Sequence, residues 1–261
     1  MLPFLKFRTR QVAFHIMSHF RDRAKIKIFV VMKTIPEPVL SRLNRIFLPI
    51  LIRRAWFKRR VNDSDDHLNL YWDSGNSATR QQLVLLIQDI VASFNEETIG
   101  VFEYGSHVGV NLKLIKEACP TTAFSMTALE PNLEACIFLK TKLPDVVVIQ
   151  GGESVFLRKS DDVRFNFHLS LVNSVFYSMS GSKTKNVIRR LCEISDFIVV
   201  GDSMINSDGN KLKFNSEPVF FSHPYRKLFN DFGFEITETI SAVDPQPQLD
   251  GFIVARRKST N

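Results

Sequence analysis

The sequence predicts an α/β protein built on a doubly wound, mostly parallel sheet of seven strands, and three observations support this fold class. Short apolar segments typical of buried strands alternate with segments of helical periodicity between residues 79 and 256. Acidic, amide and glycine residues follow several of these strands, at the sheet edge where such folds bind ligands. A short loop joins the last two predicted strands, so the C-terminal strand is expected to be antiparallel.

The first half of the predicted domain contains three strands separated by helices. Apolar side chains recur at helical spacing from Leu83 to Phe94, which indicates an amphipathic helix. Pro131 is expected in the first turn of a later helix, where its missing N–H has no helical partner to lose. The expected elements are a helix at 79–94, a strand at 99–104, a helix at 109–118, a strand at 124–130, a helix at 131–142 and a strand at 146–149.

The second half continues the alternation and ends in a hairpin. Its final two strands are separated by a proline-containing loop at 244–248. This ending differs from that of a dinucleotide-binding domain, which would close with another crossover. The expected elements are a strand at 165–172, a helix at 181–193, a strand at 197–200, a helix at 224–231, a strand at 233–239 and a strand at 251–256.

The segment 101–111 contains the most informative motif, in which a strand leads through a glycine turn into a helix. Gly105 permits unusual backbone angles and close approach to a ligand, and Gly109 begins a helix whose first amides lack partners. Glu103 ends the strand, where a buried carboxylate is costly unless it has a partner such as a ligand ammonium. The phosphate-binding patterns G-x-x-x-x-G-K-[ST] and G-x-G-x-x-G are both missing from this segment.

A second acidic residue, Glu130, ends the next predicted strand. An acid at this place can accept hydrogen bonds from both hydroxyls of a ribose. Further candidate residues also fall at the carboxyl ends of predicted strands, where a parallel sheet brings them together. These strand-end candidates are Glu103, Glu130, Gly151, Asn173 and Asp202.

Over roughly residues 97–257 the chain resembles the class I S-adenosylmethionine-dependent methyltransferases, through Glu103-x-Gly105-x-x-x-Gly109 and Glu130. Asn111 and Leu112 make it most similar to small methyltransferases of sugar and surface-glycan biosynthesis. The resemblance implies S-adenosylmethionine as cofactor, with its methionine part near Glu103 and Gly105, its ribose on Glu130, and its adenine bounded by residues 151–153. The residues expected to bind the cofactor are Glu103, Gly105, Ser106, His107, Gly109, Asn111, Glu130, Gly152, Glu153 and Asn173.

Candidate catalytic residues are Tyr177, which follows the fourth strand and could orient an acceptor, and His223, which could act as a general base at a helix start. Asp202 could act on an acceptor or cap a turn. His168 stands where many related enzymes have an acid, and we expect it to be a packed strand residue. No cluster of metal-ligating residues is visible in the sequence, so we expect no metal.

Trp72 and Arg80 lie just before and within the start of the first predicted helix of the domain. In similar enzymes the corresponding segment covers the cofactor, and both residues are candidates for such a lid. Packing of the aromatic ring on the domain edge is an equally good interpretation of Trp72.

Charge divides the chain near residue 61. Residues 1–60 hold 15 Lys and Arg against two acids, for a net charge of +13, whereas residues 61–261 have a net charge of −6. The sequence thus predicts a basic helical extension at 1–60 and a methyltransferase domain at 61–261. Three scattered cysteines favour a reducing compartment. The longest apolar run, Ile46–Ile52, is far shorter than a bilayer-spanning helix.

The basic extension contains two segments, 11–32 and 38–58, that can form amphipathic helices. Such helices bind anionic membrane surfaces or partner proteins, and simple packing on the domain is the main alternative. An organellar targeting peptide and docking to nucleic acid also stay open. We expect a cytoplasmic protein, with peripheral attachment to the inner membrane face as an open alternative.

The predicted function is methyl transfer from S-adenosylmethionine to a small-molecule, sugar or glycan-lipid acceptor, on oxygen. One alternative is a binding module that keeps the fold without catalysis, because Tyr104, Ser106, His107 and His168 depart from the family pattern. Another is a nucleic-acid methyltransferase that docks through the basic N-terminus, although nucleic acid is a less favoured partner because no aromatic RNA-binding signature is visible.

Overall fold

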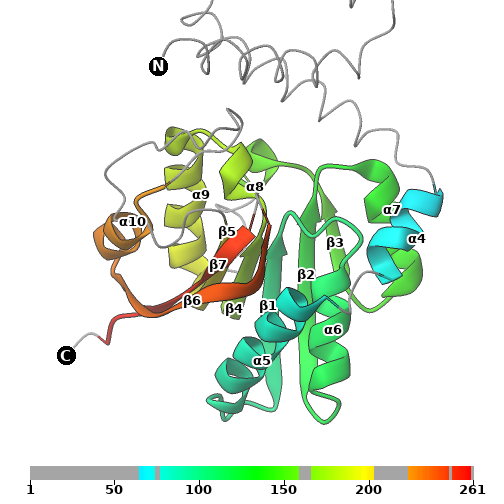
Figure 1. Ribbon diagram of the computed structural model, residues 1–261, viewed down its shortest axis with the longest axis horizontal. Coiled ribbons are helices and arrows are strands. Elements are labelled where there is room, and N and C mark those ends of the chain that lie inside the picture. The colour runs from blue at the N-terminus through cyan, green and yellow to red at the C-terminus, as the bar shows by residue number, and fades with distance from the viewer. Residues whose placement is uncertain (1–64, 74–76, 159–165, 203–222, 247–248, 260–261) are drawn as a thin grey trace, which may run out of the picture. The chain divides into compact units, whose positions relative to one another are not determined.

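Seven strands form one sheet in the part of the protein that a computed structural model describes, which is residues 65–73, 77–158, 166–202, 223–246 and 249–259 (Figure 1). The predicted basic extension and its boundary near residue 61 lie outside the described residues. The strands are β1 (Thr98–Tyr104), β2 (Ala123–Glu130), β3 (Val147–Gln150), β4 (Phe167–Asn173), β5 (Ser195–Asp202), β6 (Phe234–Gln246) and β7 (Leu249–Arg257).

The strand order is β3-β2-β1-β4-β5-β7-β6. The first five strands of the chain pair in parallel, and β7 lies antiparallel between β5 and β6. This arrangement confirms the predicted fold class, including the antiparallel C-terminal strand. The order reverses between β1 and β4, and at such a switch the connections leave in opposite directions and open a crevice at the carboxyl ends of the strands.

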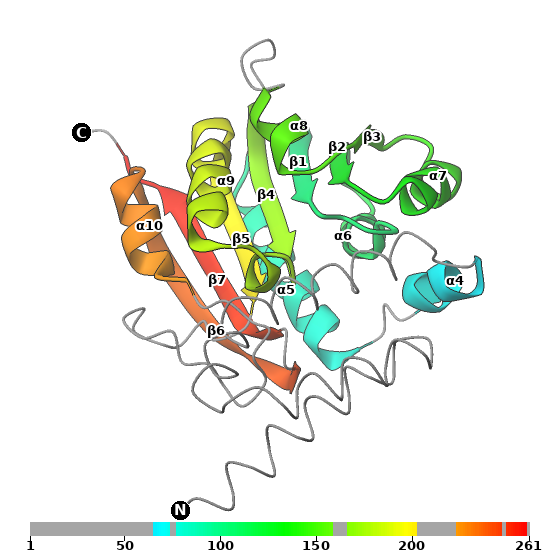
Figure 2. The ribbon, with the colours of Figure 1, turned by 90° about the horizontal axis from the view of Figure 1, so that it is seen from above.

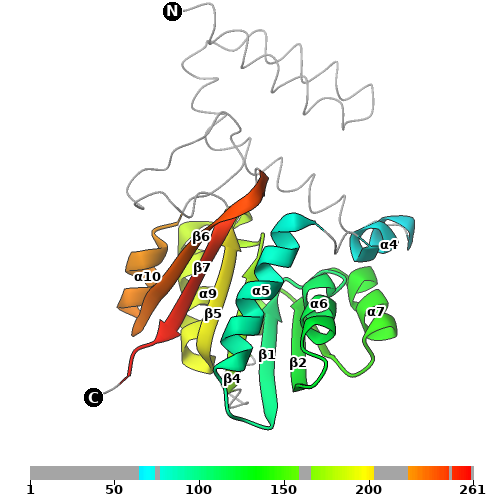
Figure 3. The same cartoon turned by 60° about the horizontal axis from the view of Figure 1, so that its bottom comes forward.

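Helices cover both faces of the sheet, as a parallel sheet requires. Apolar side chains of α5, α6 and α7 pack with one face, and those of α8, α9 and α10 pack with the other. Figure 2 shows the sheet from above, and Figure 3 shows α5 and α6 lying along β1 and β2. The helices are α4 (Asp65–Asp73), α5 (Ala78–Ala92), α6 (Val110–Ala118), α7 (Leu133–Lys142), α8 (Glu153–Arg158), the 3₁₀ turn η2 (Phe176–Ser178), α9 (Gly181–Ile194) and α10 (Tyr225–Asp231).

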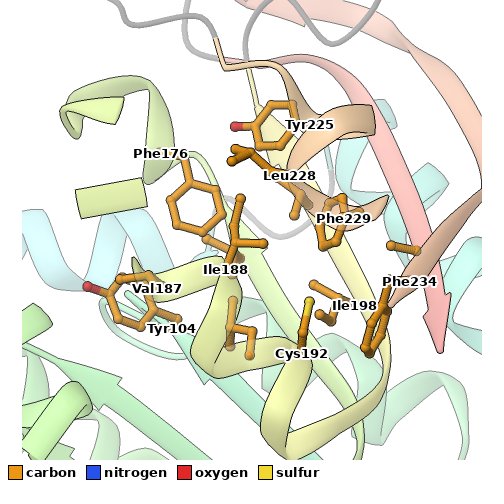
Figure 4. Close-up of a cluster of buried hydrophobic side chains, with 14 of the residues drawn as sticks. Tyr104, Phe176, Val187, Ile188, Cys192, Ile198, Tyr225, Leu228, Phe229 and Phe234 are labelled. Carbon is orange, nitrogen blue, oxygen red and sulfur yellow. The ribbon is translucent and has the colours of Figure 1, made fainter. Parts of the chain in front are cut away.

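Aromatic rings dominate the core beneath α9 and α10 (Figure 4). Phe176, Phe229 and Phe234 are fully buried, and Phe229 packs against both Phe234 and Tyr225. Truncating a buried phenylalanine of this kind to alanine costs about 3–5 kcal/mol of stability. This cluster therefore fixes α10 and the start of β6 against the sheet.

Two short helices were not predicted from the sequence. Both α4 and α8 have fewer than ten residues, so they offer few turns in which a helical period can be recognised. Length alone does not decide this, because α6 and α10 are as short and were predicted. The formation of α4 and α8 depends on packing: Leu68 of α4 and Phe156 of α8 are each buried in the core. Tertiary contacts that a local pattern does not contain thus decide both elements.

Three predicted boundaries differ from those in the structure. Pro131 precedes α7 instead of lying in its first turn, because Asn132 caps the helix by accepting from the amides of Glu134 and Ala135. The fourth strand begins at Phe167 instead of residue 165. The loop predicted at 244–248 is largely strand, because β6 continues to residue 246; Pro245 is tolerated there since β6 is at the sheet edge.

Candidate active site

The glycine loop after β1 has the conformation that its sequence predicts. Gly105 and Gly109 have φ angles of 77° and 78°, in the region that side chains with a Cβ rarely adopt. A Cβ on Gly105 would lie 2.6 Å from Cγ2 of Val175, and one on Gly109 would lie 2.9 Å from Leu139. Gly109 caps the N-terminus of α6. Glycine is therefore required at both positions, for backbone angle and for space.

Glu130 connects this loop to the end of β2. Its carboxylate accepts the backbone amide of His107 at 2.7 Å and that of Asn132 at 2.8 Å. Gly105 also donates its amide to the carbonyl of Leu129 at 2.8 Å. An ionised carboxylate has about four lone-pair positions, so its two oxygens retain capacity for ligand hydroxyls. The structure thus places Glu130 beside the loop, with its charge partly compensated by backbone amides.

Glu103, near the end of β1, is almost completely buried, with only 1% of its surface exposed. One carboxylate oxygen, Oε1, accepts from Nδ2 of Asn111 at 2.7 Å. Among the described residues, the other oxygen, Oε2, is buried without a hydrogen-bond partner, and so is Oδ1 of Asn111. Burial raises the pKa of Glu103 to about 8, against the opposing effects of Asn111 and Arg80. Two such buried acceptors on one hydrogen-bonded pair indicate a place for a group rich in N–H bonds.

The loop after β3 and the end of β4 also lie at the carboxyl ends of the parallel strands. Gly151 donates its amide to the carbonyl of Glu130, which holds this loop against β2. Glu153 begins α8 and pairs with Lys183 of α9 at 2.8 Å. At the end of β4, Oδ1 of Asn173 is a further buried acceptor with no hydrogen-bond partner in the described parts of the chain. A Cβ on Gly152 would meet nothing within 4 Å, so this glycine borders open space.

Ser106 lies in the glycine loop between these elements. Its side chain is buried, and within the described ranges its Oγ has no hydrogen-bond partner. A hydroxyl can donate one hydrogen bond and accept two. Ser106 therefore adds a polar atom that can serve a ligand from the loop itself.

Asp202 joins three elements on the other side of the site. It ends β5, is fully buried, and accepts the backbone amide of Tyr177 at 3.1 Å through Oδ1. Its second oxygen accepts the hydroxyl of Tyr225, at the start of α10. Burial and the Asp202 charge raise the pKa of Tyr225 well above its usual value, so this tyrosine stays protonated as the donor. Asp202 therefore anchors the segment that carries Tyr177.

His223 is also buried in this region. Its Nε2 lies 2.8 Å from the carbonyl oxygen of Phe176 and 3.3 Å from Oγ1 of Thr184. A carbonyl can only accept, so Nε2 carries a proton. Burial lowers the pKa of His223, outweighing the opposing effect of that carbonyl, and this favours the neutral ring. The structure thus brings His223 close to the segment of Tyr177, because Phe176 and Tyr177 are adjacent in η2.

His168, Trp72 and Arg80 occupy different places. His168 lies at the amino end of β4, where its Nδ1 accepts the amide of Gly100 at 2.8 Å; it is a packed strand residue, as expected. Trp72 packs against Phe138 of α7 and beneath Lys113 of α6, which corresponds to the edge-packing interpretation. Arg80 is half-buried in the first turn of α5; burial lowers the pKa of its guanidinium, and the negative charge of Glu103 opposes that effect.

Sequence reasoning missed three residues that shape the site. Val175 fills the space beside Gly105, Asn132 caps α7 and donates its backbone amide to Glu130, and Tyr225 holds Asp202. Asn132 carried a usable signal, because an asparagine just before a helical segment is a common cap. The contacts of Val175 and Tyr225 join segments far apart in the sequence, and no local pattern indicates them.

Neither a family model nor a curated protein matches the chain in sequence. Solved structures do match in fold. An O-methyltransferase family protein from Burkholderia thailandensis has a TM-score of 0.54 at 11% identity, over 82% of this chain and 72% of that one. An amino pentose methyltransferase from Micromonospora echinaspora, solved with S-adenosylmethionine, has a TM-score of 0.53 at 11% identity, over 73% and 96%.

The magnesium protoporphyrin IX methyltransferase from Synechocystis PCC 6803, also solved with S-adenosylmethionine, has a TM-score of 0.51 at 13% identity, over 85% of this chain and 96% of that one. The strand order of this chain and its likeness to these three structures lead to the same fold assignment. The chain has the class I methyltransferase fold. Among the described residues of this methyltransferase fold, no group of three or more side chains could hold a metal ion. Within the same residues, no helix is both long and apolar enough to cross a membrane.

Proposed function

We propose that the protein binds S-adenosylmethionine at the carboxyl ends of β1, β2 and β4 and transfers a methyl group to a small-molecule, sugar or glycan-lipid acceptor, on oxygen. The observation that carries this proposal is the buried pair of Glu103 and Asn111, whose Oε2 and Oδ1 lack donors among the described residues, beside a glycine loop. A ligand ammonium would satisfy both acceptors and neutralise Glu103. The methyltransferase fold supports the same site.

The other residues of the site fit the remaining parts of the cofactor. Glu130 retains lone pairs for ribose hydroxyls while two backbone amides hold it in place. The open space beside Gly152 can take an adenine ring. The neighbouring carboxylate of Glu153 can accept a hydrogen bond from the amino group of that ring. When bound, S-adenosylmethionine supplies a methyl group that its sulfonium already activates.

The protein's own part in the reaction is chiefly alignment of the acceptor. Proximity and orientation are worth up to about 7–11 kcal/mol in such reactions. Asp202 fixes the backbone at Tyr177, which makes Tyr177 a suitable positioning residue. His223 is kept neutral by burial, and we propose it as the base for an acceptor hydroxyl through the ring nitrogen that does not face Phe176.

Calorimetric titration with S-adenosylmethionine and S-adenosylhomocysteine tests cofactor binding. We expect micromolar affinity for the wild-type protein and a loss of about tenfold or more for Glu103→Gln, because a buried charged hydrogen bond is removed. Glu117→Gln on the exposed side of α6 is the matched control and should bind like wild type. A folded wild-type protein that binds neither compound would overturn the proposal.

Product formation separates the enzyme from a binding module. Incubation with isotopically labelled S-adenosylmethionine and a panel of sugars, lipid-linked glycans and phenols should yield a labelled acceptor. His223→Gln should slow transfer without weakening cofactor binding, because we place it on the acceptor side. Cofactor binding without any product across the panel would favour a non-catalytic module.

The basic residues 1–60 lie outside the described residues, and two roles are proposed for them. Binding to an anionic membrane surface would bring the domain to lipid-linked acceptors, and their net charge of +13 supports it. Docking to nucleic acid is the alternative. It predicts that transfer to RNA or DNA exceeds transfer to small molecules and that affinity falls steeply with salt.

A further inference from the structure

Two neighbouring helices on one face of the sheet, α9 and α10, carry an excess of basic side chains. The helix α9 lies between α8 and α10 and packs with both, and its apolar side faces the sheet (Figure 2). Four basic residues against one acid give α9 a net charge of +3, and two against one give α10 a net charge of +1. The pair thus has a net charge of +4, whereas residues 61–261 as a whole have −6.

The acids of these two helices are already paired with basic residues of their own helix. Glu193 pairs with Arg190 at 2.8 Å, and Asp231 pairs with Lys227 at 2.6 Å. The excess charge is therefore carried by other side chains, which are exposed and have no ion pair within the described ranges. These side chains are Lys185, Arg189 and Arg226.

Helix geometry places Lys185 and Arg189 on one exposed ridge of α9. They are four residues apart, so their side chains lie on the same side of the helix. Lys183 points toward α8, where it pairs with Glu153 at 2.8 Å, and positions two apart in a helix differ by about 200°. The ridge is therefore turned away from α8, toward the side on which α10 packs. We call the exposed surface of both helices that carries Lys185, Arg189 and Arg226 the basic face.

Both helices begin at the edge of the sheet at which we place the acceptor. Thr184, which precedes Lys185, has its Oγ1 3.3 Å from Nε2 of His223. Tyr225, which precedes Arg226, donates its hydroxyl to the carboxylate that ends β5. The amino ends of α9 and α10 and the carboxyl ends of the strands thus lie at the same edge. The basic face consequently adjoins the mouth of the proposed site.

We propose that the basic face docks the folded domain on an anionic lipid bilayer. Lys and Arg side chains near such a bilayer are attracted by its surface potential and need no apolar insertion. Among the described residues, no large exposed hydrophobic side chain comes from α9 or α10, so the face has no aromatic platform for stacked bases. The chemistry of the face therefore fits lipid headgroups better than single-stranded nucleic acid.

This docking face is distinct from the basic residues 1–60 and goes beyond the role proposed for them. Two linked contacts with one surface bind more tightly than either alone, because the second forms at a high effective concentration. Neutralising the face should therefore weaken vesicle binding even when residues 1–60 are intact. Docking would also bring the proposed site to lipid-linked acceptors. That last consequence rests on the proposed function, whereas the docking itself does not.

The experiment measures cosedimentation of the full-length protein with vesicles of phosphatidylserine mixed with phosphatidylcholine. A triple variant of the basic face should bind about tenfold to a hundredfold more weakly than the wild type. Its substitutions are Lys185→Gln, Arg189→Gln and Arg226→Gln. A matched control removes three cations from α6 and α7, on the other face of the sheet. The control substitutions are Lys116→Gln, Lys140→Gln and Lys142→Gln.

The control variant should lose less than about twofold, because its charges lie away from the docked surface and salt screens them there. Equal losses in the two triple variants would refute the inference, since net charge alone would then control binding. So would a wild-type protein that binds no anionic vesicles. Thermal unfolding of each variant checks that the fold is intact.

Titration of the same variants with a single-stranded RNA separates lipid from nucleic acid. A face variant that loses RNA affinity but keeps its vesicle affinity would contradict the inference and assign the basic face to nucleic acid. A wild-type protein that binds vesicles through this face but does not bind S-adenosylhomocysteine would instead overturn the proposed function and leave the docking face in place.

Discussion

At the scale of single residues, the site contains two carboxylates, Glu103 and Glu130, whose burial is energetically unfavourable for a charged group. Glu103 keeps a raised pKa because desolvation is nearly complete, and the hydrogen bond from Asn111 offsets only part of its effect. Glu130 is just as buried, yet both of its oxygens accept backbone amides. The two acids therefore differ in what they need from a ligand: Glu103 needs a cation, and Glu130 needs only hydroxyl donors.

This difference predicts a pH-dependent affinity. With a pKa of about 8 in the ligand-free protein, Glu103 is mostly protonated at pH values well below 8 and must release its proton to bind an ammonium. As the pH is raised toward 8, the affinity for S-adenosylhomocysteine should increase about tenfold per pH unit. Above pH 8 the affinity should level off. Calorimetry in buffers of different ionisation enthalpy should detect the released proton. Glu103→Gln should bind weakly with no such dependence, and a flat wild-type profile would contradict the prediction.

Tyr225 gives a second prediction at this scale. Tyr225→Phe removes the hydroxyl that donates to the fully buried carboxylate of Asp202. We expect a loss of about 1–3 kcal/mol in the free energy of unfolding, measured with urea. Tyr104→Phe is the comparison, because Tyr104 is buried against the rings of Phe156 and Phe176 instead of against Asp202. Equal losses in the two variants would argue against the role of Asp202.

The residues of the glycine loop and the adjoining strand ends were predictable because their chemistry is local. Glycines that permit a left-handed backbone and acids at strand ends can be recognised in the sequence itself. In the structure, Glu103, Gly105, Gly109 and Glu130 lie at the carboxyl ends of the paired strands β1 and β2 and in the loop after β1, as expected. The surroundings of Asp202 were not predictable in the same way. The partners of Asp202 come from η2 and from α10, and only the folded chain brings them together.

At the scale of elements, the turn from β1 into α6 is the part most sensitive to change. Gly105→Ala should strain the backbone and force a Cβ to within 2.6 Å of Val175. We expect a loss of about 1–3 kcal/mol in stability and a loss of cofactor binding. The double variant with Val175→Ala should recover the part due to the clash but not the part due to the backbone angle. Urea unfolding of the single and double variants measures both.

Gly152→Ala is the matched control for that experiment. A Cβ added at Gly152 would meet no other atom within 4 Å, and Gly152 does not adopt the left-handed backbone of Gly105. Its replacement should leave the free energy of unfolding nearly unchanged. A stability loss as large as that of Gly105→Ala would mean that glycine content, rather than the geometry of the β1–α6 turn, limits stability.

The long helices were all predicted, whereas two of the short helices were missed. Helices such as α5 and α9 repeat their apolar face over several turns, whereas α4 and α8 complete too few turns to show a period. The hairpin of β6 and β7 was expected, but β6 is longer than its pattern indicated. Its extension past Asp244 is supported by hydrogen bonds to α5, which the local sequence does not reveal.

At the scale of the whole molecule, the contrast in charge between residues 1–60 and the rest of the chain predicts a salt-sensitive attachment. The full-length protein should sediment with vesicles rich in phosphatidylserine at low salt and be released at high salt, since the attraction is screened. Replacing Arg42, Arg45, Arg53 and Arg54 with glutamine should reduce binding. Equal binding to neutral vesicles would contradict the electrostatic explanation.

The position of β7 has a consequence for how the chain folds. It lies between β5 and β6, although it follows both in sequence, and Thr79 and Asp244 join positions 165 residues apart. Such distant pairings cost much chain entropy before they form, which slows folding. During synthesis on a ribosome, the edge of β5 stays unpaired until β7 emerges, and the start of α5 lacks its hydrogen bonds to β6 until β6 emerges. A nascent chain of this protein is therefore expected to depend on chaperones that shield an open strand edge until then.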